Sequence, residues 1–249
     1  MRRIFFDYKG ECVADDGLSV GKIVAVGGGQ HIHLSTVLRA RTGDSVAVCG
    51  GDGFMYGSKI ESISKQKTVL KIIDACKDEA EPSINVTLFF AIQKGDSNDF
   101  TVQKCVELGV SALIPVKTKF CVKQNINIDR LNKIAFSAAV QSGRGVVPTV
   151  FEPINLSEIF DKLPNFDLFV LPYEKADKPT LKEFLDKNLG KETKSVAVLI
   201  GPEGGFCKSE IDAFLDAKII PISMGKIIMR AETACIAAMT AVMYQSQNL

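Results

Sequence analysis

The second part of the chain alternates apolar runs with amphipathic helical segments, and this alternation limits the possible folds more than any other feature. The runs 86–92 and 112–116 are almost wholly apolar, and segment 129–142 repeats apolar side chains at helical spacing. Strands that are apolar throughout are buried on both faces, and helices between them make their pairing parallel. The pattern therefore predicts a parallel sheet covered by helices on both faces. We expect further strands at 168–171, 196–200 and 219–223, and helices from about 98 and at 129–142, 180–188, 208–217 and 231–246.

The first 75 residues follow a different pattern of short, β-like runs. The runs 45–49, 59–63 and 68–73 are separated by glycine-rich or polar turns, which is typical of a small barrel-like sheet. One helical segment is expected at 31–41, ended by Gly43. A charged stretch at 77–82 then reads as a linker, so we expect two domains, residues 1–75 and 76–249.

Composition narrows the functional classes. The 249 residues are 46% apolar and 24% charged with a net charge of +1, which argues against a strongly basic nucleic-acid-binding protein. Residues 1–149 nevertheless hold 19 basic and 15 acidic side chains, a small positive excess in the front half. No apolar stretch is long enough to span a membrane and the first residues lack a signal peptide's apolar core, so we expect a cytoplasmic protein. The seven cysteines form no C-x-x-C pair and the two histidines have no ligand cluster, so neither disulfides nor a metal are expected.

A glycine-rich loop follows the apolar run 196–200. It reads Gly201-Pro202-Glu203-Gly204-Gly205 and leads into the helix expected from residue 208. Ligands bind beyond the carboxyl ends of parallel strands, and glycine lets a ligand approach the backbone. A tight structural turn would explain Gly204 and Gly205 but not Pro202 and Glu203, so a binding loop and a structural turn both stay open. The loop is not a phosphate cradle of the GxxxxGK[ST] or GxGxxG kind.

A second loop, residues 224–230, precedes the last apolar helix. Glu232 or Thr233 would serve simply as a helix-capping or first-turn residue. Arg230 lies between apolar Met229 and a helix expected to be buried, where a guanidinium needs a carboxylate or phosphate partner. This loop is therefore a second candidate binding segment.

Polar side chains gather where the helix at 129–142 ends. Gln141, Ser142 and Arg144 surround Gly143, which suits a helix C-cap. Such donors suit phosphate or base contacts and equally well ordinary capping.

Together these segments resemble the ribosomal small subunit methyltransferase E family, the bacterial 16S rRNA uridine-N3 methyltransferases of the SPOUT superfamily. The resemblance spans nearly the whole chain. It rests on the motifs His33-Leu34-Ser35-Thr36-Val37-Leu38-Arg39, Gln93-Lys94-Gly95-Asp96, Glu107-Leu108-Gly109-Val110, Gln141-Ser142-x-Arg144, Gly-Pro-Glu-Gly-Gly at 201–205 and Met-Gly-x-Ile-Ile-Met-Arg-x-Glu-Thr-Ala at 224–234. Two segments depart from the family's usual residues. Its usual Leu-Gly-x-Arg-Ile-Leu-Arg appears here as Met224-Gly225-Lys226-Ile227-Ile228-Met229-Arg230, and its usual Glu-Gln-Ser appears as Val140-Gln141-Ser142.

The resemblance implies a PUA-like β-barrel that helps to bind RNA, followed by a SPOUT α/β domain with a C-terminal trefoil knot. It implies that S-adenosylmethionine is held by the loops after three strands, and that Arg230 and Glu232 take part in catalysis. The residues expected to hold the cofactor are Leu171, Pro172, Gly201, Pro202, Glu203, Gly204, Gly205, Met224, Gly225, Ile228, Arg230 and Thr233. The residues expected to contact RNA are Arg2, Arg3, Arg39, Arg41, Gln141 and Arg144.

The expected partners are 16S rRNA in the small ribosomal subunit and a second copy of the chain. The helix at 231–244 is apolar on nearly all sides, so it needs cover all round. Three alternatives stay open: a nucleotide- or phosphate-binding α/β enzyme, a non-catalytic RNA-binding ribosome assembly factor, and an RNA methyltransferase with another target nucleotide.

Overall fold

The chain forms two compact units in the computed structural model, which describes residues 2–6, 8–14, 17–121 and 125–249. The first unit comprises residues 1–81 with 139–147, and the second comprises 82–138 with 148–249. The expected division at residue 75 differs from these units, because segment 139–147 clusters with the first of them.

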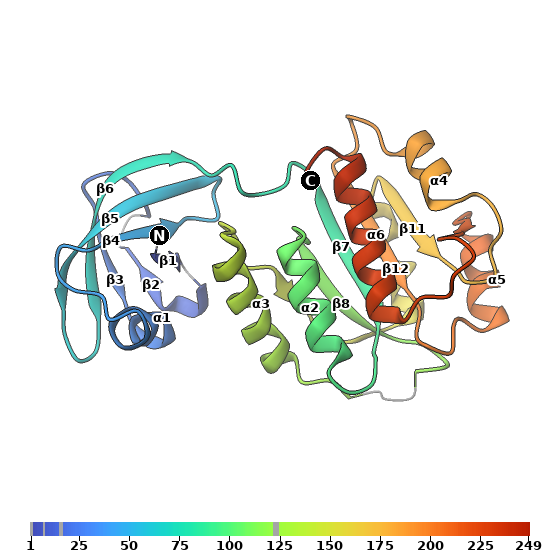
Figure 1. Cartoon of the computed structure of the whole chain (residues 1–249), viewed down its shortest axis with the longest axis horizontal. Coiled ribbons are helices and arrows are strands. Elements are labelled where there is room, and N and C mark those ends of the chain that lie inside the picture. The colour runs from blue at the N-terminus through green and yellow to red at the C-terminus, as the bar shows by residue number, and fades with distance from the viewer. Residues whose placement is uncertain (1, 7, 15–16, 122–124) are drawn as a thin grey trace. The chain divides into compact units, whose positions relative to one another are not determined.

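A six-stranded sheet builds the first unit and curves into a half-barrel (Figure 1). Its strands run in the order β1 (Arg2–Phe5), β4 (Ser45–Cys49), β5 (Phe54–Ile63), β6 (Thr68–Lys77), β3 (Ile23–Val26) and β2 (Cys12–Val13). The first pair, β1 and β4, is parallel and the other pairs are antiparallel. The runs expected at 45–49, 59–63 and 68–73 are confirmed as β4 and parts of β5 and β6, whereas β1, β2 and β3 were not expected.

The helical segment of this unit lies earlier in the chain than residues 31–41. Helix α1 (Gly28–Ile32) continues into a π-helical turn, η2 (His33–Val37), and Arg39 has a left-handed φ of 47° just beyond it. The carboxylate of Glu11 accepts hydrogen bonds from the backbone N–H groups of Gly29 and Gln30, both at 3.0 Å. The exposed donors at the start of α1 are therefore satisfied by the unit's own carboxylate.

A parallel sheet builds the second unit, as the apolar runs predict. Its strands run in the order β10 (Ile154–Asn155), β8 (Ala112–Lys117), β7 (Asn85–Ala91), β12 (Ser195–Ile200), β11 (Leu168–Pro172) and β13 (Pro221–Ile222), with β9 (Thr149–Val150) also paired to β8. Every pair is parallel. The run expected at 219–223 is shortened to β13.

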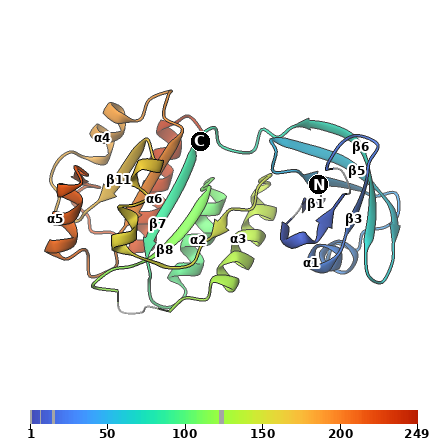
Figure 2. The ribbon, with the colours of Figure 1, turned by 180° about the vertical axis from the view of Figure 1, so that it is seen from behind.

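Helices cover both faces of this sheet. The five helices of eight residues or more are α2 (Ser97–Glu107), α3 (Ile128–Ser142), α4 (Leu181–Asn188), α5 (Lys208–Asp216) and α6 (Ala231–Gln245). Helix α6 packs against β7 and β12 between α2 and α4 (Figure 1). Seen from behind, the strands lie in front of α6 (Figure 2). On the opposite face, Phe214 of α5 packs with Phe89, Phe169 and Leu199 of the sheet. No helix among the described residues is both long and apolar enough to cross a membrane.

Main-chain hydrogen bonds fix the segment that follows β13. The N–H of Ser223 donates to the carbonyl of Pro179 at 2.9 Å, and the N–H of Leu181 donates to the carbonyl of Ser223 at 2.8 Å. Residue 223 is thus bonded to the start of α4 before the chain continues to α6. These bonds hold the loop after β13 beside the loop between β11 and α4.

Candidate functional site

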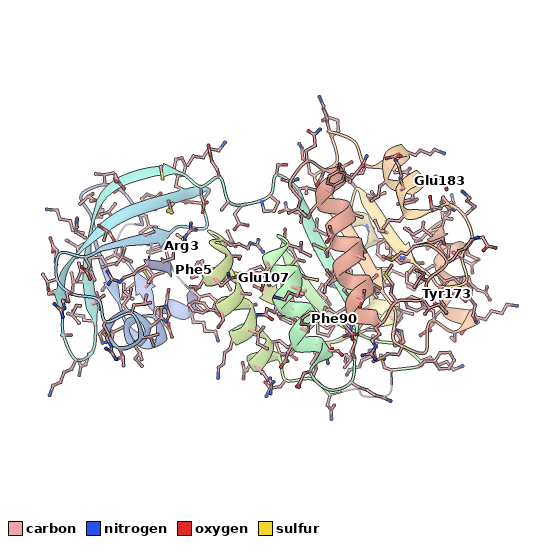
Figure 3. The ribbon with its side chains drawn as sticks, viewed as in Figure 1. Arg3, Phe5, Phe90, Glu107, Tyr173 and Glu183 are labelled. Atoms are coloured by element: carbon pink, nitrogen blue, oxygen red, sulfur yellow. The ribbon has the colours of Figure 1, made fainter. Side chains whose placement is uncertain are left out.

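Three loops meet at the carboxyl edge of the second unit's sheet. Strand β11 lies between β12 and β13, with Val170 opposite Val198 and Pro172 opposite Ile222. The loops that begin after Pro172, Ile200 and Ile222 therefore start at the same level. Tyr173 belongs to the first of them (Figure 3), and its N–H donates to the carbonyl of Ile222 at 2.9 Å. Ligands of open parallel sheets bind at this edge.

The loop at 201–205 is shaped partly by its own packing. A Cβ at Gly201 would lie 2.9 Å from the Phe206 ring, and one at Gly204 would lie 3.1 Å from Cβ of Phe120. Gly205 has a φ of +68° and its α-carbon faces the Glu174 carboxylate. A structural turn therefore explains Gly201 and Gly205. Glu203 and Gly204 remain exposed on the loop, where a ligand can reach their backbone.

The N-terminus of α5, just beyond this loop, is capped by the chain itself. The carboxylate of Glu210 accepts a hydrogen bond from the N–H of Cys207 at 2.8 Å and another from the N–H of Lys119 at 2.8 Å. An incoming phosphate at this helix end would meet a carboxylate already bound there. This arrangement disfavours the alternative of a phosphate-binding α/β enzyme.

The loop at 224–230 is open to its surroundings. Gly225 has a φ of +106° with nothing within 4 Å of a Cβ built there, and its N–H donates to Oγ of Ser223 at 3.3 Å. Met224 is half-buried, whereas Ile227 and Ile228 are 82% and 81% exposed. Two neighbouring apolar side chains exposed to this degree mark a surface that a ligand or another chain would cover.

Arg230 lies in an environment opposite to the expected one. It is exposed, so the expected burial is wrong, and among the described residues no carboxylate pairs with it; the phosphate partner that was the other expectation stays a prediction. It is the N-cap residue of α6, with an extended backbone at φ −65° and ψ 154°, and its carbonyl accepts from the N–H of Ala234 at 2.9 Å. Its side chain is thus available to a ligand.

Glu232 and Thr233 do not cap α6. The N-cap position belongs to Arg230, whose side chain makes no capping hydrogen bond. Glu232 is half-buried in the first turn and Thr233 is exposed. Burial raises the pKa of the neighbouring Cys235 thiol well above its usual value, and the charges of Cys105 and Glu232 add to that rise. Glu232 is therefore a charged group set against the buried side of α6.

The expected RNA contacts of the first unit differ in exposure. Arg39 and Arg41 are exposed, and Arg2 is half-buried in an ion pair with Asp44 at 2.7 Å. A hydrogen bond from the N–H of Arg41 lowers the pKa of Asp44, and Arg2 lowers it further. Arg3, on β1 (Figure 3), is half-buried and donates to the carbonyls of Gly143 and Arg144.

The helix end at 141–144 contains both exposed and buried residues. Gln141 is exposed, and Gly143 is the left-handed C-cap with a φ of 75°. Arg144 is only 4% exposed and pairs with Glu81, with 2.6 Å between Nη2 and Oε2. Of the two interpretations left open for this helix end, the buried ion pair favours a structural role for Arg144, whereas Gln141 and Ser142 are exposed and can be reached by a ligand.

Sequence reasoning missed the two carboxylates that organise these segments. Glu81 lies in the charged stretch read only as a linker, and Glu210 lies in the first turn of an ordinary helix. The partners of Glu81 and the Lys119 partner of Glu210 are distant in sequence, so no local pattern points to them, whereas the bond between Glu210 and Cys207 has the three-residue spacing of a helix cap. Among the described residues, no group of three or more His, Cys, Asp or Glu side chains could hold a metal ion.

Comparison with known proteins gives consistent matches over most of the chain. Residues 80–243 match the family model of the RNA methyltransferase domain. The chain is 30% identical over 225 residues to ribosomal RNA small subunit methyltransferase E of Bacillus subtilis (strain 168), covering 87% of this chain and 88% of that protein. It is 29% identical over 214 residues to the protein of that name from Rickettsia conorii, covering 85% and 86%. A crystal structure of ribosomal RNA small subunit methyltransferase E from Neisseria gonorrhoeae bound to S-adenosyl methionine is similar with a TM-score of 0.83 and 30% identity, covering 98% and 97% of the two chains.

Proposed function

The chain belongs to the RNA methyltransferase domain family, among the ribosomal RNA small subunit methyltransferase E proteins, and from this premise we propose that it methylates N3 of a uridine in 16S rRNA. The methyl donor is S-adenosylmethionine, the molecule bound in the related Neisseria gonorrhoeae structure. One observation carries the proposal: the loops after β11, β12 and β13 meet at one edge of the sheet, and an exposed Arg230 follows the third of them.

The loops at this edge fit such a cofactor. Gly225 combines a left-handed backbone with open space where a side chain would be, and Gly204 is exposed on the neighbouring loop. When bound, S-adenosylmethionine supplies an electrophilic methyl group on a positively charged sulfur. The residues that would hold it are Leu171, Pro172, Gly201, Pro202, Glu203, Gly204, Gly205, Met224, Gly225, Ile228, Arg230 and Thr233. We further propose that this region carries the family's trefoil knot, which the bonds from Ser223 to Pro179 and Leu181 support.

Attack by N3 requires that the uridine ring loses the proton of that nitrogen. We assign to Arg230 the stabilisation of the resulting negative charge, or of a flanking phosphate, since its guanidinium is exposed beside the loops. Glu232 and Thr233, in the first turn of α6, hold the loop in place, and positioning supplies much of the rate. We assign the proton to solvent water. Because N3 lies on the pairing edge of uridine, the target base must be unpaired or flipped out when it reacts.

The exposed or half-buried basic residues of the first unit are the proposed RNA contacts. Arg2, Arg3, Arg39 and Arg41 supply positive charge, and exposed Gln141 supplies a neutral donor. The buried pairing of Arg144 with Glu81 supports a structural role for Arg144 instead. A ribosomal RNA substrate implies action in the cytoplasm.

We propose that the protein is a homodimer. Ile227 and Ile228 are exposed in the single chain, and so is Tyr244 of α6, at 71%. Helix α6 is otherwise largely apolar. A second copy would cover these side chains. Light scattering at micromolar concentration should give twice the mass of the 27.0 kDa chain, and a mass of one chain would overturn this assignment.

The decisive experiment is methylation of purified small ribosomal subunits that lack the modification. Labelled S-adenosylmethionine should transfer its methyl group to one uridine, detected as N3-methyluridine by mass spectrometry of nuclease fragments. Arg230→Lys keeps the backbone contacts proposed for residue 230, so it should lower the rate more than it lowers cofactor affinity measured by calorimetry. A label on another nucleotide would establish a different target. RNA binding without cofactor binding would instead identify a non-catalytic assembly factor.

A further inference from the structure

The first unit contains a recess that the cofactor site does not explain. Its volume is about 570 Å³, and it is lined by Arg2, Arg3, His33, Leu38, Ser45 and Val140. All six residues belong to the first compact unit. Strand β1, which carries both arginines, is an edge strand that pairs with β4 and with no other of the described strands. The recess therefore lies at an open side of the sheet and has the size of a small-molecule site.

The two arginines of the recess differ in how their charge is balanced. The Arg2 guanidinium pairs with Asp44, whose Oδ2 also accepts the N–H of Arg41 at 2.9 Å. Among the described residues no carboxylate forms an ion pair with Arg3, whose guanidinium donates to two neutral carbonyls and also interacts with the Cys49 thiol. Asp78 and Glu81 act on the neighbouring Cys49 thiol but line no part of the recess.

Arg3 is thus a half-buried cation held in place by main-chain oxygens. A guanidinium offers five N–H groups in a planar fork, and the bonds to Gly143 and Arg144 both come from Nη1. Its other N–H groups are oriented by this anchoring, so little side-chain freedom would be lost when they bind an anion. The fork matches the geometry of carboxylates and of phosphates, and phosphate is the anion that an RNA strand supplies.

The remaining walls of the recess suit the rest of a nucleotide. His33 and Ser45 add polar side chains, with Ser45 exposed at the first residue of β4. Leu38 and Val140 give an apolar wall. An isolated inorganic anion would use only the arginines, whereas a phosphate joined to a sugar and base would use both kinds of wall.

We propose that this recess binds one nucleotide of the RNA substrate, with its phosphate on Arg3 and its sugar or base against Leu38 and Val140. The proposal rests on RNA being the substrate, and it adds to that function a defined contact point that is distinct from the exposed Arg39 and Arg41. Binding here would anchor the strand on the barrel, independently of the cofactor.

The test measures binding of a single-stranded fragment of 16S rRNA by fluorescence anisotropy at several salt concentrations, without cofactor. Arg3→Gln removes the central charge, and Ser45→Glu places a carboxylate at the exposed rim without touching the bonds of Arg3. Both should weaken RNA binding about tenfold, and Arg3→Gln should lower the slope of log K against log salt by about 0.7. Lys65→Gln, in the exposed turn between β5 and β6, is the matched control because it removes one positive charge outside the recess. It should change neither the RNA affinity nor the salt slope by a comparable amount.

A second readout uses the two histidines of the chain. His33 lines the recess, whereas buried His31 lies 2.9 Å from Oγ1 of Thr68 through its Nδ1 and serves as an internal control. Adding RNA should shift the imidazole resonances of His33 but not those of His31, and Ser45→Glu should abolish the shift. Unchanged RNA affinity in both variants with an unmoved His33 would overturn the proposal. A shift with uridine monophosphate and none with RNA would overturn the assignment to an RNA strand. Failure of methyl transfer with these binding results intact would count against the proposed reaction alone.

Discussion

Removal of the Glu81 carboxylate should destabilise the first unit strongly, because that group makes four hydrogen bonds. Oε1 accepts from Nε of Arg144 at 3.2 Å, from the N–H of Gly145 at 2.9 Å and from the N–H of Val146 at 3.1 Å. Oε2 accepts from Nη2 of Arg144 at 2.6 Å. One carboxylate therefore joins the segment after β6 to the loop after α3, within the same compact unit.

The magnitude follows from the burial of the two partners. The Arg144 side chain is 5% exposed and that of Glu81 is 22% exposed, so Glu81→Ala leaves a nearly buried guanidinium without its carboxylate. Breaking a buried pair in this way costs about 3–5 kcal/mol, and partial access of water to Glu81 places the loss near the lower value, about 3 kcal/mol. For a chain of this size, a loss of about 3 kcal/mol lowers Tm by roughly 6–12 °C.

Thermal unfolding followed by circular dichroism measures this loss, since the chain has no tryptophan to report it by fluorescence. Hydrogen exchange over β4 and β6 should show that the destabilisation lies in the first unit. The double variant Glu81→Leu with Arg144→Met should recover most of the stability, because it removes both charges together. Glu61→Ala, at an exposed position of β5, is the control. A loss below about 0.5 kcal/mol for Glu81→Ala, or a double variant no better than the single one, would refute the reasoning.

Three further predictions concern the second unit and the thiols. Gly225→Ala should weaken S-adenosylmethionine binding about tenfold by calorimetry, because a φ of +106° is strained for any residue with a side chain. Gly190→Ala, where a Cβ also meets nothing within 4 Å, is the control and should leave cofactor binding unchanged. Burial raises the pKa of Cys49 to about 11, so at pH 8 iodoacetamide should label exposed Cys76 rapidly and Cys49 slowly by mass spectrometry; equal rates in the folded protein would contradict this. A hydrogen bond from Lys178 lowers the pKa of Glu183 from 4.5 to about 2, so its stabilising effect is complete above pH 4.5 and is lost as the pH falls toward 2; acid titration of Glu183→Gln should show a shallower loss of stability over that interval.

The sheet of the second unit could be predicted from sequence because its strands are buried on both faces. Runs such as 86–92, 168–171 and 196–200 are apolar throughout, and this composition by itself indicates burial on both faces. They agree with β7, β11 and β12 to within about two residues. The glycine loop at 201–205 then follows from its place after a strand. Strand β13 was harder to delimit, because only two residues of the apolar run at 219–223 pair with β11.

The barrel was predicted less completely because its missing strands are short. β1 contains two arginines and β2 only two residues, so neither shows an alternation that can be recognised. β3 is four residues long and leads into the glycine run at 27–29, which was not read as the start of a helix. Glycine is unfavourable in helices, and α1 nevertheless begins there because Glu11, from a separate segment, bonds to its first N–H groups.

Arg230 and Arg144 show why the surroundings of a charged side chain escape a local pattern. Met229 and the helix after it predicted burial for Arg230. Arg230 is instead the N-cap residue of α6, where the backbone is extended, and its side chain is exposed. Arg144 follows a helix end, where ligand contacts and ordinary capping were equally open, and Glu81, 63 positions earlier in the chain, provides the charge that allows its burial. Apolar neighbours in sequence are not enough to bury a guanidinium, because removing an unpaired charge from water costs too much free energy. A guanidinium is buried where the fold places a carboxylate beside it. The same reasoning separates the two arginines: Arg144, whose carboxylate partner is brought by the fold, stabilises the first unit, whereas the exposed Arg230 is accessible to the ligand that we propose for it.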